Sequence, residues 1–314
     1  MSFPILGLHH VTATADDAQA DLDFVLDALG LRLVKKTVNF DNRGVYHFYY
    51  GDERGTPGTL WTTFPYRLRH VPTGIKGAGQ VTVTSFSVPA GSLPRWKARL
   101  LEYGAAHATD VPPRFGEESI VVTDPSGLAI ELVATASDLR TPWLANDVDS
   151  DMAIRGIHGV TMTVDDPAPT LAFMREWFGF DVADEMDGRL RLSVNGSGPG
   201  KSVDLLTSSD GTRARNGVGT VHHVAMAIAE PAEQLRLREA LVARGVEVTP
   251  VLDRSYFQSI YFREPGGVLF EVATMAPGFT VDEPLAELGR GLKLPPWEEA
   301  RRTEIEAALP PVQY

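Results

Sequence analysis

The sequence contains no cysteine. Disulfides, thiolate metal sites and a cysteine nucleophile are therefore excluded, and a transition metal in this chain would need histidine and carboxylate ligands. The chain has eight histidines among its 314 residues. Two adjacent pairs of them, in LHHVT from residue 8 and VHHVA from residue 221, make the strands that carry them the first candidates for a functional site.

Long apolar runs and basic clusters are also missing. No apolar stretch reaches the length of a membrane span, and the N-terminal MSFPILGLHH lacks the basic segment and cleavage site of a signal peptide. We therefore expect a cytoplasmic protein without a membrane partner. The formal net charge is −12, and the most basic segment is the short RLRH at 67–70. Such a charge repels a phosphate backbone, so we do not expect nucleic acid as a partner.

The sequence does contain an internal repeat. The segments LHHVT, IHGVT and VHHVA begin at residues 8, 157 and 221, and each opens a pattern of strand, helix and further strands. An offset of 149 positions carries Asp17 to Asp166, and the same offset carries Gly30 to Gly179. These residues suit the start and the end of a helix. An offset of 140 positions relates TDPSGLAIELVAT to REPGGVLFEVAT, each of which predicts a hairpin turn followed by a strand.

The repeat predicts four modules of βαβββ type, at about 6–66, 80–135, 154–208 and 219–274. We therefore predict an α+β fold with curved mixed sheets, in which the four modules are paired into two similar domains, 1–140 and 150–278. The tail at 279–314 carries a charged amphipathic helix. This helix suits packing on the domains or contact with a second copy of the chain. The sequence is therefore compatible with a homo-oligomer.

Strand alternation predicts which histidine of each pair faces a cavity. Neighbouring strand residues point to opposite faces, so His223 shares a face with Ala225 and Ala227, which are small enough to leave space. The same alternation turns His222 toward the face with the bulky residues of its strand. We therefore expect His223 to face a cavity and His222 to point away from it.

The same count applies to the first and the last strand of the repeat. It turns His10 and Glu271 toward the cavity and His9 away from it. Two histidines and one carboxylate form the facial triad that suits Fe(II) and leaves coordination positions open. We therefore predict a metal site made of His10, His223 and Glu271.

Together with LHHVT and VHHVA, the segments GTPGTLWTTFP, DRSYF and PGGVLFE resemble the vicinal oxygen chelate superfamily (glyoxalase, bleomycin resistance and extradiol dioxygenase proteins). Within it, the chain is similar to the dioxygenases that cleave para-hydroquinone rings, and the likeness spans nearly the whole chain. It implies one Fe(II), with Mn(II) as an alternative, held by the same triad. It also implies O2 and a small aromatic substrate, with or without chlorine.

The resemblance further implies catalytic roles for four other residues, which are Tyr261, Arg254, His9 and His222. A hairpin centred on the EPGG turn also places Tyr261 opposite Glu271, from where its hydroxyl could reach a metal-bound oxygen. For His9 and His222 the resemblance and the alternation disagree, which leaves open whether they act in catalysis or only support the site. The remaining histidines without a matching partner, His47, His70 and His107, are expected to have surface or core roles.

The number of carboxylates separates the candidate reactions. The residue six positions after the turn proline is Glu131 in the second module and Glu271 in the fourth, but Thr63 in the first. In the third module Asp204 lies one position away from the matching place. Because glyoxalase I enzymes need a second carboxylate at about that place, the threonine favours an oxygenase. A glyoxalase-type lyase or isomerase and a metal-free protein that sequesters a ligand stay open as alternatives.

A second metal site is not expected. The strand that would accompany Glu131 reads QVTVTSFSV and offers no histidine, while the third module has Gly159 at the ligand position and His158 on the other face. The sequence therefore predicts a single site. It leaves open the ring substituents of the substrate, the choice between Fe(II) and Mn(II), and the oligomeric state.

Overall fold

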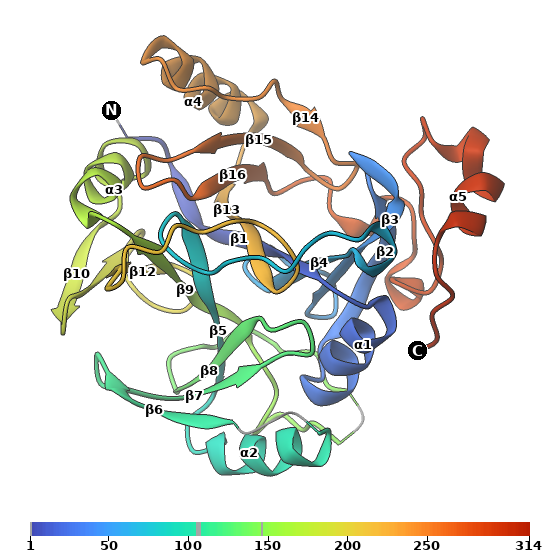
Figure 1. Cartoon of the computed structure of the whole chain (residues 1–314), viewed down its shortest axis with the longest axis horizontal. Helices are drawn as coiled ribbons and strands as arrows, with labels where there is room; N and C mark the ends of the chain where they lie inside the picture. The colour runs from blue at the N-terminus through green and yellow to red at the C-terminus, as the bar shows by residue number, and fades with distance from the viewer. Residues whose placement is uncertain (1, 105–107, 146) are drawn as a thin grey trace.

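The computed structural model describes residues 2–104, 108–145 and 147–314. Their strands form two eight-stranded mixed sheets, each curled into a half-barrel, and the helices lie around the outside (Figure 1). The first sheet has the order β14-β15-β16-β13-β1-β4-β3-β2. Its strands are β1 (Ile5–Ala15), β2 (Arg32–Asn39), β3 (Asn42–Gly51), β4 (Leu60–Pro65), β13 (Thr220–Ile228), β14 (Leu252–Asp253), β15 (Gln258–Arg263) and β16 (Leu269–Thr274).

The second sheet has the order β10-β11-β12-β9-β5-β8-β7-β6. Its strands are β5 (Gln80–Pro89), β6 (Thr109–Arg114), β7 (Glu117–Thr123), β8 (Ala129–Thr135), β9 (Gly156–Val164), β10 (Asp181–Met186), β11 (Arg189–Ser193) and β12 (Ser202–Thr207). The helices are α1 (Ala18–Asp23), α2 (Leu93–Glu102), α3 (Pro167–Phe173), α4 (Pro231–Ala243) and α5 (Arg302–Ala308). One π-helical turn follows α1 (Phe24–Ala28) and another follows α3 (Met174–Phe178), and short 3-10 turns occur at Arg67–Arg69, Phe279–Val281, Leu285–Glu287 and Glu299–Arg301.

These elements confirm the predicted α+β fold of four βαβββ modules. The modules do not pair in chain order, because β1 lies antiparallel to β13, and β5 lies antiparallel to β9. The first sheet therefore joins the first module to the fourth, and the second sheet joins the second module to the third. The division into domains at 1–140 and 150–278 stays a prediction, and neither sheet is confined to one of these ranges.

The repeated residues at the helix ends have the expected local roles. The Asp17 side chain accepts hydrogen bonds from two backbone N–H groups at the start of α1, and Asp166 accepts one at the start of α3. Gly30 has a φ of +69° and Gly179 a φ of +70°, the left-handed conformation in which glycine commonly stops a helix. The offset in the sequence therefore corresponds to a repeated strand and helix in the structure.

The tail packs on the first sheet of its own chain. Ile305 in α5 is buried, and the hydroxyl of Tyr46 on β3 donates to the carbonyl of Pro310 at 2.9 Å. Among the described residues, no helix has both the length and the apolar character that crossing a membrane requires. A role of the tail in an oligomer stays a prediction.

A buried carboxyl connects α1 to the sheet. Asp21 accepts hydrogen bonds from Tyr50 at 2.7 Å and from Thr63 at 2.5 Å, while its Oδ1 is buried without a partner in the described chain. Burial raises the pKa of Asp21 from 3.8 to about 7. The folded state therefore holds this proton more tightly than the unfolded state does.

We expect Asp21 to make stability fall as the pH rises. Its contribution is full below pH 3.8 and is lost as the pH approaches about 7, with a slope of up to about 1.4 kcal/mol per pH unit between these values. Asp21→Asn should remove this slope, because the amide cannot ionise. Urea unfolding at pH 5, 6, 7 and 8 measures it, with Asp27→Asn, exposed just after α1, as the control. An equal slope in parent and Asp21→Asn would contradict the assignment.

Candidate metal centre

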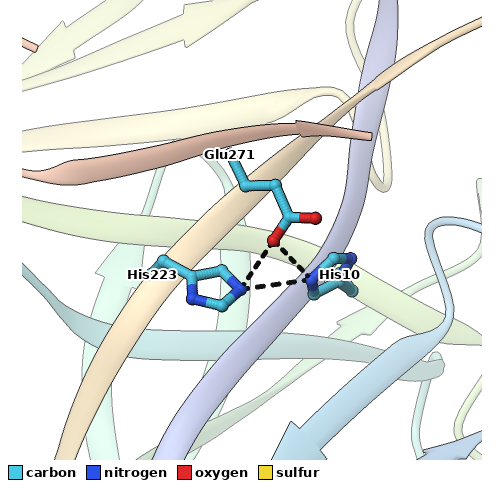
Figure 2. A group of neighbouring side chains, drawn as sticks. All are labelled: His10, His223 and Glu271. Carbon is cyan, nitrogen blue, oxygen red and sulfur yellow. Dashed lines mark hydrogen bonds and ion pairs between the residues drawn. The ribbon is translucent and has the colours of Figure 1, made fainter. Parts of the chain in front are cut away.

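Three adjacent central strands bring the predicted triad together. In the register of the sheet, His10 on β1 lies opposite Ala225 on β13, and Ala225 lies beside Glu271 on β16. Figure 2 shows the three polar side chains converging from separate strands. The Nε2 of His10 is 3.2 Å from the Oε2 of Glu271 and 3.3 Å from the Nε2 of His223, and the latter nitrogen is 2.8 Å from the same oxygen.

The donor atoms fit a divalent cation. All three side chains are buried, and their ligand atoms lie within 4.8 Å of one another. Glu271 accepts a hydrogen bond from Ser259 on Oε1, whereas its Oε2 is buried without a hydrogen-bond partner among the described residues. Burial alone would raise the pKa of Glu271, but His10 and His223 hold it well below its ordinary value. Burial also lowers the pKa of His223. An ionised carboxylate therefore faces imidazole nitrogens in a buried position, as a metal site requires.

The expectation that His222 points away from the cavity is wrong, because His222 lines it, whereas His9 contacts His10 without lining the cavity. The pairing of β1 with β13 shifts at His9 and again at His222, so each pair sits at a β-bulge. A bulge breaks strict alternation because one residue is left unpaired. The Nδ1 of His9 lies 2.9 Å from the Nδ1 of His10, and that of His222 lies 2.8 Å from the Nδ1 of His223. Each of these histidines therefore contacts a member of the triad.

The contact with His9 determines which ring nitrogen of His10 has a free lone pair for a metal ion. The Nε2 of His9 lies 3.2 Å from the carbonyl oxygen of Thr274, which can only accept, so Nε2 carries the proton. Burial, with His10 alongside, lowers the pKa of His9 to about 3, so its Nδ1 is an acceptor. His10 must then donate from its own Nδ1. This leaves the lone pair of its Nε2 directed toward Glu271, the arrangement that an outer partner gives a metal-binding histidine.

Tyr261 lies directly opposite Glu271 across β15 and β16, as the hairpin prediction placed it. Its hydroxyl accepts a hydrogen bond from Arg254 at 3.2 Å, and its ring centre is 5.5 Å from that of His223. Burial and the carboxylate of Glu271 raise the pKa of Tyr261 well above its ordinary value. Tyr261 is therefore a neutral phenol that can donate a proton to a hydrogen bond beside the triad.

The triad opens into a cavity of about 400 Å³. Besides the triad, its lining includes His222, Tyr261, Arg254, Phe257 and three residues of β3 and β4, which are His47, Tyr49 and Phe64. The surface or core role expected for His47 is thus corrected. Alternation along VYHFYY could have found it, since Tyr46, Phe48 and Tyr50 pack in the main core and leave His47 and Tyr49 on the other face. His70 is exposed, and His107 lies outside the described residues.

In the first and third modules, the residue that occupies the position of Glu271 differs from the one expected from the sequence. In the sheets, Ala225 lies beside Glu271, Thr12 beside Thr62, and Thr161 beside Asp204. The equivalents of Glu271 are therefore Thr62 and Asp204, because counting from the turn proline overshoots by one residue in the first module. Thr63 instead faces α1, and Asp204 forms a buried ion pair with Arg191 at 2.8 Å. In the part of the chain that the structure describes, no second carboxylate joins the triad.

Glu131, the equivalent carboxylate of the second module, is already fully engaged. It accepts hydrogen bonds from Ser85 at 2.5 Å and Ser119 at 2.7 Å, and it forms an ion pair with Arg114. Ser85 stands beside Glu131 in the sheet where Ala225 stands beside Glu271. In the second module, serine and arginine side chains therefore occupy the space beside the carboxylate that stays open beside Glu271 in the fourth module.

Comparisons with known proteins agree with this architecture. Residues 156–272 match the Glyoxalase/Bleomycin resistance protein/Dioxygenase superfamily. The chain is 41% identical over 304 residues to MhqE of Bacillus subtilis (strain 168), whose name assigns it provisionally as a ring-cleaving dioxygenase, with 97% of this chain and 98% of MhqE covered. It is 37% identical over 308 residues to the chlorohydroquinone/hydroquinone 1,2-dioxygenase of Sphingobium indicum, with 95% and 94% covered.

A solved structure extends the likeness to the whole fold. The crystal structure of a provisionally assigned dioxygenase from Bacillus subtilis matches with a TM-score of 0.93 at 39% identity, and 99% of both chains is covered. The chain therefore belongs to the Glyoxalase/Bleomycin resistance protein/Dioxygenase superfamily. Within that superfamily it is a ring-cleaving dioxygenase, which confirms the predicted enzyme class.

We expect one metal ion per chain, bound by the triad. His10→Ala, His223→Ala and Glu271→Gln should each weaken metal binding by more than the 10- to 100-fold that is typical of losing an outer partner. Glu131→Gln is the matched control, since it changes the equivalent carboxylate of the other half-barrel, and it should leave the metal content unchanged. Elemental analysis of anaerobically purified proteins measures the ratio. Two ions per parent chain, or loss of metal only in the control, would refute a single site here.

Proposed function

We propose that this ring-cleaving dioxygenase is Fe(II)-dependent, with His10, His223 and Glu271 as the metal ligands, and acts on a para-hydroquinone. The observation that carries the proposal is the buried, unpartnered Oε2 of Glu271, which faces two imidazole nitrogens at the floor of a cavity. A two-histidine, one-carboxylate set suits Fe(II), and Mn(II) is the alternative ion. The hydroquinone substrate named for the Sphingobium indicum relative supports the substrate class.

The metal would supply Lewis acidity toward a phenol and a route for electrons from the ring to O2. The protein's own residues orient and shield the reactants. His9 holds His10 with its Nε2 turned inward, and Ser259 holds the second oxygen of Glu271. Aromatic side chains line the cavity and exclude water from the ring. These include Tyr49, Phe64 and Phe257.

Two groups beside the triad are suited to stabilise negative charge. The side chain of Arg254 is 16% exposed, and its guanidinium lies next to the hydroxyl of Tyr261. A phenolate, or an oxygen that gains charge during the reaction, would be met by a fixed cation and a neutral donor. We therefore assign charge stabilisation to both residues. His222 lines the same cavity and supports the Nδ1 of His223.

Oxygen consumption tests the proposed reaction. Iron-loaded protein should take up one O2 per ring cleaved with hydroquinone or a chlorohydroquinone, and far less with catechol, whose two hydroxyls are ortho instead of para. An oxygen electrode measures the uptake, and Glu271→Gln at equal protein concentration is the control. Turnover of an α-ketoaldehyde adduct without O2 uptake would instead indicate a glyoxalase-type reaction and overturn the proposal.

Tyr261→Phe should keep the metal and slow the reaction. The variant preserves the ring beside His223 and removes only the hydroxyl that faces the reactants. Loss of a donor that acts mainly in the transition state costs roughly 10- to 1000-fold in rate with little change in binding. Oxygen uptake at full iron occupancy measures kcat and KM separately. Normal kcat would remove Tyr261 from the mechanism, and loss of iron would show that it supports the metal site instead.

A further inference from the structure

The cavity has two polar flanks. In the sheet order, the triad strands β16, β13 and β1 are central, Tyr261 and Arg254 lie on the β15 side, and His47 lies on β3, two strands beyond β1. The curl of the sheet brings these flanks together, because Arg254 forms an ion pair at 3.3 Å with Asp41, in the turn between β2 and β3. A ring held at the triad is thus enclosed from both sides.

His47 is held rigidly on its flank. Its ring centre lies 4.0 Å from that of Tyr49 and 4.3 Å from that of Phe64. Its Nε2 is 3.0 Å from the hydroxyl of Thr62, which is 2.7 Å from the hydroxyl of Thr12. The ring is thereby held by two aromatic neighbours and by a hydrogen bond at one nitrogen, as a binding group that is organised in advance should be.

The other nitrogen of His47 is free to meet a ligand. Its Nδ1 has no hydrogen-bond partner among the residues that the structure describes, and the side chain lines the cavity without being fully buried. Burial, with His10 and His223 nearby, lowers the pKa of His47 well below 6.5, so the ring is neutral. Both threonine hydroxyls can donate or accept. Reversing their hydrogen bonds lets Nδ1 act either as donor or as acceptor.

We propose that His47 is a substrate-positioning residue, whose Nδ1 hydrogen-bonds the ring hydroxyl that is not held at the His10, His223 and Glu271 centre. This inference rests on the proposed function. In a para-hydroquinone the second hydroxyl points away from the first, into the enclosing wall, where an unpaired hydroxyl among aromatic groups would be costly. A site built around such a hydrogen bond also rejects analogues that lack the hydroxyl. His47 would thus select for the second hydroxyl.

Ligand binding without turnover tests this selection. Iron-loaded protein is titrated anaerobically with hydroquinone and with 4-methylphenol, in which a methyl group of similar size replaces the second hydroxyl. The parent protein should prefer hydroquinone. In His47→Phe, which keeps a ring between Tyr49 and Phe64, the affinity for hydroquinone should fall roughly 3- to 10-fold, as for the loss of one neutral hydrogen bond. The affinity for 4-methylphenol should stay within twofold, estimated as roughly the background effect of such a change.

Two further variants and a control make the test robust to misfolding. Thr62→Val removes the partner of Nε2 and should reduce the preference for hydroquinone, while Thr62→Ser keeps the hydroxyl and should restore it. His70→Phe, at an exposed histidine outside the cavity, should change nothing. Thermal melting checks that each variant is folded. If His47→Phe does not fold, Thr62→Val and Thr62→Ser still test the hydrogen bond to His47.

Each other outcome overturns the inference in a distinguishable way. If His47→Phe lost the same affinity for hydroquinone and for 4-methylphenol, His47 would only shape the cavity wall and would not bind the second hydroxyl. A preference unchanged in His47→Phe and Thr62→Val would exclude the hydrogen bond. A preference that disappears in Tyr261→Phe instead would place the second hydroxyl on the opposite flank. If the parent takes up no O2 with hydroquinone and binds neither ligand, the proposed function fails, and this inference fails with it.

Discussion

The antiparallel pairing of β1 with β13 is the constraint on which the site depends. It joins the first module to the fourth and brings His10 and His223, 213 residues apart in the chain, to adjacent strands. Two of the three bulges in this pairing, those at His9 and His222, are equally important. Each bulge turns a histidine onto the Nδ1 of its neighbour, and this contact directs the Nε2 of the neighbour inward. The ligand geometry is thus set by backbone register before any metal binds.

The two half-barrels show how one scaffold serves two purposes. At an offset of 140 positions, Arg114 corresponds to Arg254 and Val121 corresponds to Tyr261. In the second module Arg114 reaches Glu131 and neutralises it. In the fourth module Tyr261 engages Arg254 instead, and among the described residues no arginine or lysine pairs with Glu271, whose Oε2 faces only the imidazoles of His10 and His223. A buried ionised carboxylate without a fixed cation is unfavourable unless a cation is bound there, so the asymmetry itself indicates a metal site.

Much of the fold and the triad could be predicted from the sequence, because both depend on periodicity. The module repeats follow from the offsets, and strand alternation turned His10, His223 and Glu271 to one face. The failures have one physical origin, which is local departure from regular strand geometry. Bulges moved His9 and His222, and a turn of different length shifted the carboxylate register from Thr63 to Thr62.

His47 was missed for a different reason. The repeat pattern points to residues that recur between modules, and His47 has no counterpart in that pattern. A residue that serves a substrate need not recur in every module. Its neighbours Tyr46 and Phe48 already gave the alternation that places it. In this chain the triad residues lie on strands that the repeat identifies, whereas His47 lies outside the repeated pattern.

The tail of the chain supports one wall of the cavity from behind. Lys35 on β2 is fully buried and forms ion pairs with Asp282 at 2.5 Å and with Glu283. Asp282 in turn accepts a hydrogen bond from Tyr256 at 3.0 Å, next to Phe257. The ring of Phe257 packs against those of both His9 and His10. Buried ion pairs contribute little net stability but impose a unique geometry when every partner is present. The residues after the last module therefore hold in place the aromatic side chain that packs against His10 of the triad.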